Sequence, residues 1–108
     1  MCGIVGIHNR DGRPVSPADL HRATNLLAHR GPDDCGYVLI DTSSNQATEA
    51  ADESTIAAAR DRFARVETLI GRHDLGFGHR RLSIIDLSPG GHQPMADAQR
   101  QHWITYNG

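Results

Sequence analysis

The sequence predicts one small α+β domain whose strands are mostly antiparallel. Short apolar runs rich in β-branched residues alternate with turn residues, which is typical of strands. Two other segments repeat apolar side chains at intervals of three and four, which is the spacing of an amphipathic helix. With 108 residues, the chain can bury the modest core of a single domain.

The first strand and the first helix are predicted near the N-terminus. Residues 2–8 form an apolar, β-branched run that ends in turn residues, so we expect a buried strand. Ser16, Pro17 and Asp19 then supply an N-cap, a proline at the first helical position and an acidic residue in the first turn. These signals predict a helix that runs through Ala28. Its inner face consists of small and aliphatic side chains, those of Leu20, Ala23, Leu26 and Leu27.

The rest of the chain is predicted to alternate strands with a loop and a second helix. Residues 37–41 have the composition of a strand. Residues 42–53 are polar and poor in large apolar side chains, so we expect a surface loop. Ser54 can cap a second helix that ends at Gly71, because apolar residues recur between them at helical spacing. That stripe comprises Ile56, Ala59, Phe63, Val66 and Ile70. Three short strands are expected at residues 75–79, 82–85 and 102–106.

The composition argues against several classes of protein. The formal net charge is −2 and all 11 basic residues are arginine, so we expect no nucleic-acid partner and no lysine nucleophile. No apolar run reaches the roughly 18 residues of a membrane span, and the N-terminus lacks the pattern of a signal peptide. We therefore expect a cytoplasmic protein that does not associate with membranes. Cys2 and Cys35 are then free thiols, and because their spacing fits no common zinc motif, we expect no metal.

A cysteine directly follows the initiator methionine. Removal of Met1 would leave Cys2 with a thiol of pKa about 8.5 and a free α-amine of pKa about 7.7 to 8. One residue would then carry both a nucleophile and a base, as N-terminal nucleophiles do. On its position alone, Cys2 is more simply an accident of the chain start, so the other motifs decide its meaning.

Three segments place chemically active residues at expected turns. They are residues 29–34, 78–86 and 106–108. Together with Cys2 they suggest acyl transfer, because a thiolate that attacks an amide carbonyl creates an oxyanion. The Asn107 side chain and the Gly108 N–H could donate two hydrogen bonds to it. A substrate with its own carboxylate would need a fixed cationic fork, which Arg80 or Arg81 could provide.

Four motifs in this order resemble the glutaminase domain of glutamine-hydrolysing asparagine synthetases. They are C-G-I-V-G at residues 2–6, H-R-G-P-D-D at 29–34, H-R-R-L-S-I-I-D-L-S at 79–88 and G-H-Q-P-M at 91–95. The first motif is shared by other class II glutamine amidotransferases. The others favour asparagine synthetase-like proteins over the phosphoribosylpyrophosphate and fructose-6-phosphate amidotransferases. The resemblance implies an N-terminal nucleophile hydrolase fold, a four-layer αββα sandwich of which only the first part is present.

The resemblance also implies roles for individual residues. Cys2 matches the nucleophile, and Arg81 rather than Arg80 matches the arginine that binds the α-carboxylate of L-glutamine. Asn107 and Gly108 match the oxyanion hole. The backbone that lines the glutamine pocket matches four consecutive residues, Leu82, Ser83, Ile84 and Ile85.

Neighbouring polar residues have simpler explanations. Arg30 and Asp33 flank a Gly-Pro turn and are expected to organise that loop. His79 is expected to be structural, since the N-terminal amine already supplies a base. His92 lies in a glycine- and proline-rich loop that is expected to shape the site, with no acid-base role for His92 itself. Cys35 is expected to be a buried or half-buried thiol.

The resemblance implies that residues 1–108 are part of a glutaminase domain. The remainder of that domain is expected to be absent, and so is a C-terminal synthetase domain. In this family the synthetase domain uses ATP and Mg²⁺ to amidate aspartate or a related carboxylate. Within 1–108 no cofactor is expected, and the expected partners are L-glutamine and the synthetase domain. Residues 42–76 form a longer stretch than is usual in this family, which suggests a specialised branch. Two alternatives are an inactive fragment or interaction module, and a hydrolase of similar fold that acts on another amide.

Overall fold

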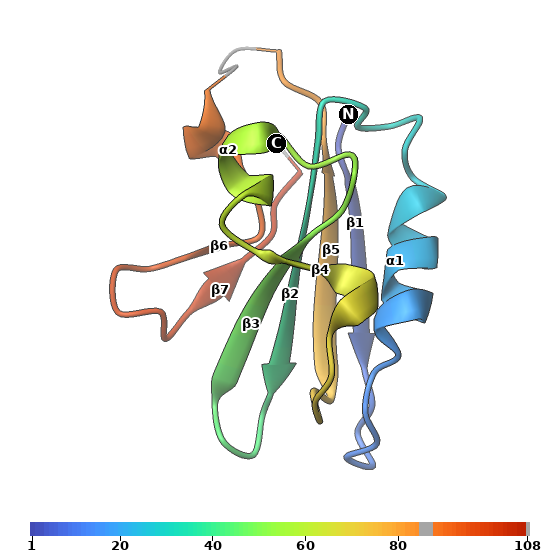
Figure 1. Ribbon diagram of the computed structural model, residues 1–108, viewed down its shortest axis with the longest axis vertical. Coiled ribbons are helices and arrows are strands. Elements are labelled where there is room, and N and C mark those ends of the chain that lie inside the picture. Colours follow the sequence, from blue (N-terminus) through green and yellow to red (C-terminus); the bar gives the residue numbers. More distant parts are fainter. Residues whose placement is uncertain (85–87, 108) are drawn as a thin grey trace.

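The structure is a computed structural model that describes residues 1–84 and 88–107. These residues form a five-stranded sheet in the order β1-β5-β2-β3-β4 and a separate two-stranded hairpin, β6-β7 (Figure 1). The strands are β1 (Gly3–His8), β2 (Asp34–Asp41), β3 (Gln46–Ala51), β4 (Ala64–Arg65), β5 (Leu75–Arg81), β6 (Met95–Ala96) and β7 (Trp103–Ile104). The helices are α1 (Pro17–Asn25) and α2 (Ala57–Arg60), and two single 3₁₀ turns are η1 (Val66–Thr68) and η2 (Pro89–Gly91).

Strand β5 lies between β1 and β2 and pairs with both of them in antiparallel fashion. Arg80 is the register partner of Gly3 on one side and of Cys35 on the other. The start of β1, the end of β5 and the start of β2 therefore meet at one end of the sheet. In Figure 1 this is the upper end, where the N-terminus lies.

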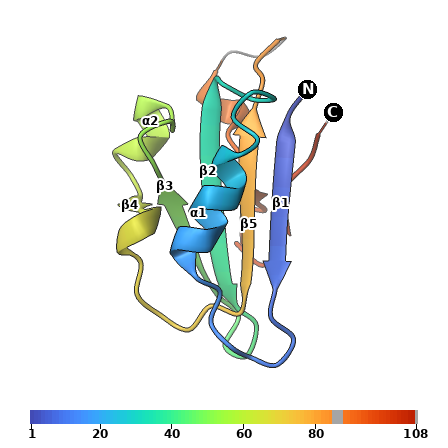
Figure 2. The same ribbon diagram turned by 90° about the vertical axis from the view of Figure 1, so that its right-hand side faces the viewer.

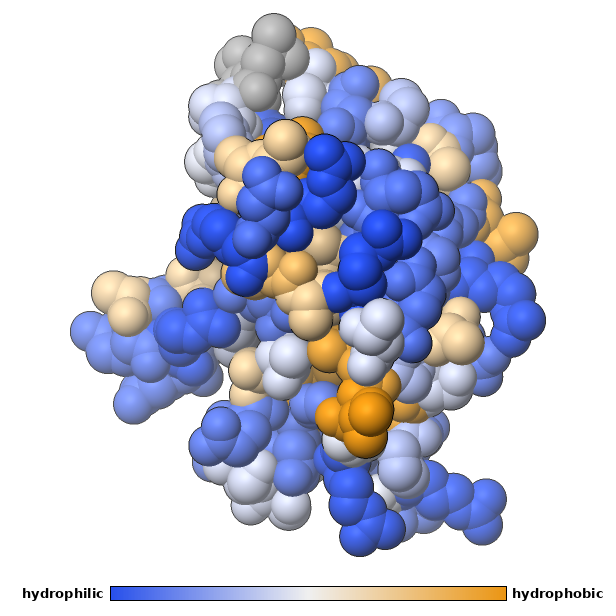
Figure 3. All heavy atoms as spheres, viewed as in Figure 1, coloured by the Kyte–Doolittle hydropathy of each residue, from blue (hydrophilic) through white to orange (hydrophobic). Residues whose placement is uncertain are grey.

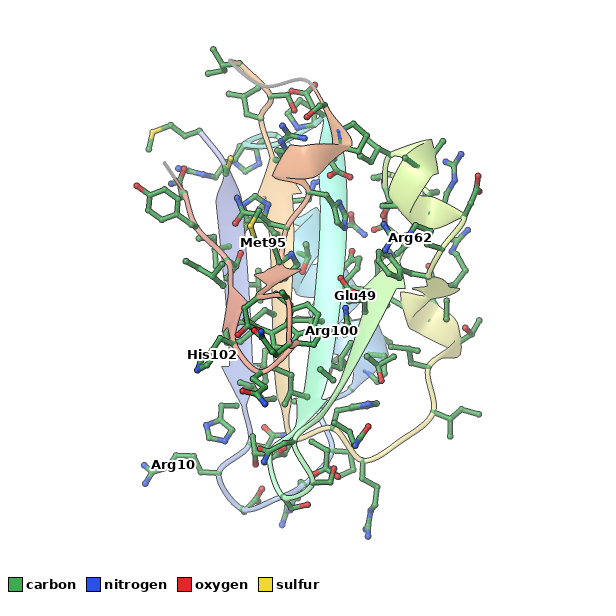
Figure 4. The ribbon with its side chains drawn as sticks, turned by 90° about the vertical axis from the view of Figure 1, so that its left-hand side faces the viewer. Arg10, Glu49, Arg62, Met95, Arg100 and His102 are labelled. Carbon is green, nitrogen blue, oxygen red and sulfur yellow. The ribbon has the colours of Figure 1, made fainter. Side chains whose placement is uncertain are left out.

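Helix α1 covers one face of the sheet, and the β6-β7 hairpin lies on the other face (Figure 2). The helix begins as predicted, because the Ser16 side chain accepts a hydrogen bond of 3.2 Å from the backbone N of Asp19. Leu20 and Thr24, which belong to this helix, are fully buried. On the other face, Arg100 of the hairpin donates to Glu49 of β3 at 3.0 Å and stacks over Trp103 (Figure 4).

The core lies between α1 and the sheet. It contains Val15, Leu20, Cys35, Tyr37, Leu39, Ala50 and Val66. Cys35 is the buried thiol that the sequence predicts, and burial raises its pKa to about 12. Tyr37 donates a hydrogen bond of 2.6 Å to Asp52, a carboxylate with no exposed surface. The core therefore includes a polar network as well as aliphatic side chains.

The predicted loop at residues 42–53 is wrong. Residues Gln46–Ala51 form β3, which pairs with β2 in antiparallel fashion, and Ala50 and Ala51 are fully buried. The strand is missed because its inward residues are small, so the segment has little apolar signal. Backbone pairing with β2 stabilises it instead.

The long second helix predicted at residues 54–71 is also wrong. Only Ala57–Arg60 are helical, and the chain then forms β4 and η1. Pairing of Ala64 with Ala50 of β3 competes with helix formation there. Of the expected inner residues, Val66 is buried whereas Ile70 is 96% exposed.

Smaller differences concern element ends. Helix α1 ends at Asn25 rather than Ala28, which leaves Leu26 mostly exposed. Strand β2 begins earlier than predicted, at Asp34. The strand predicted at residues 82–85 is absent over 82–84, and Ile85 lies outside the described residues. At the C-terminal end only Trp103–Ile104 form a strand, β7, whose partner β6 was not predicted.

The α+β class is confirmed, whereas the four-layer sandwich stays a prediction. Hydrophilic side chains dominate the face shown in Figure 3, with apolar side chains in smaller groups between them. Among the described residues, no helix has the length and apolar character needed to cross a bilayer.

Candidate active site

Cys2 lies at the upper end of the sheet, directly before β1, where it contacts two distant segments. Its backbone N donates a hydrogen bond of 3.1 Å to Oδ1 of Asn107. The backbone N–H of Leu82, just beyond β5, donates to the Cys2 Sγ at 3.4 Å. The structure therefore brings together three of the predicted site residues.

The contact between Cys2 and Asn107 fixes how the Asn107 amide is used. Because Oδ1 accepts the Cys2 N–H, the amide nitrogen Nδ2 remains the donor end of that side chain. An amide donor has the chemistry needed to stabilise an oxyanion. Gly108, the other predicted donor, lies outside the described residues.

Two side chains hold the segment that carries Asn107. The backbone O of Tyr106 lies 3.1 Å from Nε2 of His79. The backbone N of Tyr106 donates to Oε1 of Gln93 at 2.6 Å. A carbonyl oxygen only accepts, so Nε2 of His79 carries the proton. Burial lowers the pKa of His79, which favours this neutral form. His79 is thus a positioning residue, in keeping with its expected structural role.

The buried His79 predicts a pH dependence of stability. Its pKa is lower in the folded chain than the ordinary value of 6.5, so below that value the unfolded chain binds a proton that the folded chain does not. The free energy of unfolding should therefore fall as the pH is lowered through 6.5. Urea denaturation between about pH 5 and 7.5 should show a smaller pH dependence for His79→Gln than for the wild type. Equal slopes for the two proteins would contradict this assignment.

The loop after α1 braces both Cys2 and the segment after β5. Nε of Arg30 donates to the backbone O of Cys2 at 3.2 Å, and the Asp33 carboxylate accepts the backbone N–H of Ser83 at 2.7 Å. The side chains thus contact other segments, and their expected role within the Gly-Pro turn stays a prediction. The contact of Arg30 with Cys2 was missed because the order of motifs in the chain gives no measure of their distance in space.

The two adjacent arginines of β5 point to opposite faces. Arg80 faces α1, where it donates to Gly31 O at 2.9 Å and to Asn25 Oδ1 at 3.2 Å. Arg81 follows it and therefore lies on the same face as Cys2. Arg80 contacts α1 and the loop after it, whereas Arg81 lies on the face of the sheet that carries Cys2.

Arg81 is packed against the loop that follows β5. Its Nη1 donates to the backbone O of Ser88 at 2.8 Å, and the side chain is largely buried. Gly91 permits this contact, because a Cβ there would lie 2.2 Å from the Arg81 guanidinium. Of the other predicted pocket residues, Ile84 is 76% exposed, and Ile85 lies outside the described residues.

A histidine–carboxylate contact that the sequence did not reveal anchors the same loop. Nδ1 of His92 lies 2.6 Å from the carboxylate of Asp34, which is almost completely buried. Gly36 allows the loop to approach β2, because a Cβ there would lie 2.0 Å from the backbone O of Gln93. His92 and Asp34 are 58 residues apart, so only the sheet register could have shown that they meet.

Comparison with known proteins identifies the family. A family model described as a glutamine amidotransferase domain matches residues 40–108. The chain belongs to this family. Because the match begins at residue 40, it covers Leu82 and Asn107 but not Cys2.

Full-length relatives extend the similarity to the N-terminal part of the amidotransferase domain. The chain is 32% identical over 106 residues to a putative glutamine-hydrolysing asparagine synthetase of Methanocaldococcus jannaschii. This alignment covers 98% of the chain and 15% of the relative. It is 29% identical over 111 residues to a glutamine-hydrolysing asparagine synthetase of Bacillus subtilis, covering 100% of the chain and 13% of that relative.

A third relative has a different name. The chain is 31% identical over 118 aligned residues to the amidase chry2 of Gibberella zeae, covering 100% of the chain and 13% of the relative. The chain therefore spans only 13–15% of the length of these curated relatives. No solved structure matches the chain at a significant level.

Proposed function

We propose that this amidotransferase domain hydrolyses L-glutamine to glutamate and ammonia through a thioester on Cys2. The observation that carries the proposal is the contact of Cys2 with both Asn107 and Leu82. Removal of Met1 would convert the backbone N of Cys2 into a free amine that already faces Asn107 Oδ1. The other residues of the site then have roles that their chemistry supports.

The N-terminal amine acts as the base in this mechanism. It accepts the thiol proton, and the Cys2 sulfur attacks the side-chain carbonyl carbon of glutamine. The tetrahedral intermediate collapses to a γ-glutamyl thioester, and the amine returns its proton to the departing ammonia. Water, deprotonated by the same amine, then attacks the thioester and releases glutamate and the free thiol.

Hydrogen-bond donors stabilise the charges that develop along this path. The Leu82 N–H donates to the Cys2 sulfur at 3.4 Å, so it is oriented toward the atom that attacks the substrate. Nδ2 of Asn107, together with the N–H of Gly108, is proposed to bind the oxyanion of each tetrahedral intermediate. Such donors act strongly because they are already oriented before the reaction.

Arg81 is proposed to bind the α-carboxylate of glutamine, with the backbone of residues 82–85 as the wall of the pocket. Arginine suits this role because its planar guanidinium forms two parallel hydrogen bonds to a carboxylate. The contact with Ser88 O fixes the position of the Arg81 side chain. Arg81 would then determine that the substrate is an amino acid rather than a simple amide.

Ammonia is proposed to pass to a synthetase domain that amidates a carboxylate with ATP and Mg²⁺. The names of two relatives support aspartate as the acceptor, whereas the amidase name of the third leaves a related carboxylate open. ATP and Mg²⁺ take no part in the proposed steps on Cys2. We expect this activity in the cytoplasm.

A glutamine-analogue electrophile tests the proposal directly on this chain. It should label Cys2 once and leave Cys35 unlabelled at neutral pH, because burial raises the pKa of the Cys35 thiol to about 12. Peptide mass spectrometry would locate the label, and intact mass would report whether Met1 is removed. Retention of Met1 in the active protein would exclude the amine as base. A folded chain with a free N-terminal Cys2 that resists the reagent would instead support an inactive module.

A further inference from the structure

A cluster of imidazole and carboxylate groups lies on the α1 side of the sheet, away from Cys2. It joins two segments, namely helix α1 and the turn after β3, and η1 lies beside it. His21, Asp52 and Glu53 each offer one ligand atom, and these atoms all lie within 4.8 Å of one another. Gly3 faces Leu27 of α1, so the neighbouring Cys2 points to the opposite face. The cluster is therefore separate from the candidate active site.

The position of the His21 ring is unusual for an ordinary ion pair. Its Nε2 lies 3.2 Å from Oδ2 of Asp52 and 3.7 Å from Oε1 of Glu67. Nevertheless this buried nitrogen forms no hydrogen bond with any residue that the structure describes. Two atoms bound to one tetrahedral zinc ion, at about 2.0 to 2.2 Å each, are roughly 3.3 Å apart and point at the ion rather than at each other.

Asp52 has the environment of a fixed metal ligand. Its side chain has no exposed surface. The Tyr37 hydroxyl donates to Oδ2 at 2.6 Å, and the backbone N of Ser54 donates to Oδ1 at 2.7 Å. Hydrogen bonds of this kind orient ligating carboxylates in metal sites. A buried carboxylate is stable only when a positive charge or further donors lie near it, and the ligand atoms of His21 and Glu53 lie within 4.8 Å.

Glu67 and Arg65 complete the surroundings of the cluster. Nη2 of Arg65 lies 2.9 Å from Oε2 of Glu53 and 3.3 Å from Oε1 of Glu67. Nε of Arg65 also donates to Oε2 of Glu67 at 3.3 Å, so Arg65 contacts both oxygens of Glu67. Glu53 contacts Arg65 through Oε2, and its other oxygen can contact an ion. Arg65 then offsets part of the negative charge of the carboxylates around the site.

We propose that His21, Asp52 and Glu53 form a Zn²⁺ site. One imidazole nitrogen and two carboxylate oxygens are ligands that zinc accepts, and a water molecule can complete the tetrahedral geometry. The ion would tie α1 to the turn after β3. A Zn²⁺ site here differs from the expectation of no metal. That expectation was based on cysteine spacing, and the sequence does not show that His21 lies next to Asp52.

Binding of Zn²⁺ to the tag-free chain tests this site without reference to glutamine hydrolysis. Isothermal titration should give a single Zn²⁺ per chain, and Co²⁺ should give the visible absorption of a tetrahedral N/O site. His21→Ala and Glu53→Gln should each weaken Zn²⁺ binding by roughly tenfold or more. Glu53 is the sharper test because its side chain is 62% exposed, so its replacement leaves the core intact if His21→Ala does not fold.

His102→Ala is the matched control. His102 also pairs with a carboxylate, Asp97, at 2.8 Å, but it is 83% exposed and belongs to the hairpin on the other face (Figure 4). Its replacement should leave Zn²⁺ binding unchanged. The proposal would be overturned by a wild-type chain that binds no Zn²⁺, by unchanged binding in Glu53→Gln, or by loss of binding in His102→Ala. In the first case the cluster is a set of ion pairs without a metal.

Discussion

Replacement of Cys2 by alanine is expected to reduce glutamine hydrolysis by roughly 10⁴-fold or more, since it removes the only group that forms the proposed thioester. The other contacts of the site should persist. The backbone N of residue 2 donates to Asn107 through an atom that alanine also has. In a protein that joins this domain to a synthetase domain, synthesis from free ammonia should therefore continue. Steady-state assays with glutamine and with ammonium salts would measure both activities.

Cys35→Ala provides the control for this experiment. It removes the other thiol of the chain, which is buried beside Tyr37 at 3.3 Å from its hydroxyl. Glutamine hydrolysis should be retained, with at most a modest loss of stability. Glutaminase turnover that survives in Cys2→Ala would refute the thioester mechanism. Loss of turnover in Cys35→Ala, with the fold preserved, would show that the assignment of the nucleophile is incomplete.

Asn107 should have two separable functions, and two substitutions can distinguish them. Asn107→Ala removes both the acceptor for the Cys2 nitrogen and the donor for the oxyanion, and it should lower kcat by roughly 10² to 10³-fold. Asn107→Asp keeps an oxygen that can accept from Cys2 but has no amide donor. If the oxyanion contact is the important one, the aspartate variant should be about as defective as the alanine variant.

The matched control for Asn107 is Tyr106→Phe. Tyr106 belongs to the same segment and its side chain is exposed, while its backbone makes the contacts with His79 and Gln93. The phenylalanine variant should therefore retain normal kcat. Wild-type kcat in Asn107→Asp would mean that this residue only holds the N-terminus.

The elements with strong local signals could be predicted from the sequence. The N-cap at Ser16 and the strand at β1 depend on neighbouring residues, and both are confirmed. The burial expected for β1 is wrong, because β1 lies at the edge of the sheet and its Ile4 is exposed. Strand β3 could not be predicted, because small residues such as Ala50 and Ala51 acquire their buried positions only by pairing with β2. The prediction of the long second helix was wrong because a local signal was overridden. The helical periodicity is present in the sequence, but Ala64 of β4 pairs with β3 instead.

The candidate site shows the same division between local and long-range information. Cys2 and Asn107 could be selected because each has distinctive chemistry, and the resemblance placed them in one family. Their contact with each other and with Leu82 is a property of the fold. The bracing residues, such as Arg30 and Asp34, could not be assigned partners because those partners are set by sheet register and loop approach.

The separation of the contacts around Cys2 has a consequence for how the protein is made. Its sulfur meets Leu82 across 80 residues, and its nitrogen meets Asn107 across 105 residues. During synthesis the N-terminus leaves the ribosome first and this last partner leaves much later. Closing so long a loop is entropically costly until the intervening strands have formed. Cys2 therefore lacks these contacts on the nascent chain, and the proposed site is assembled only after translation has passed the final contact.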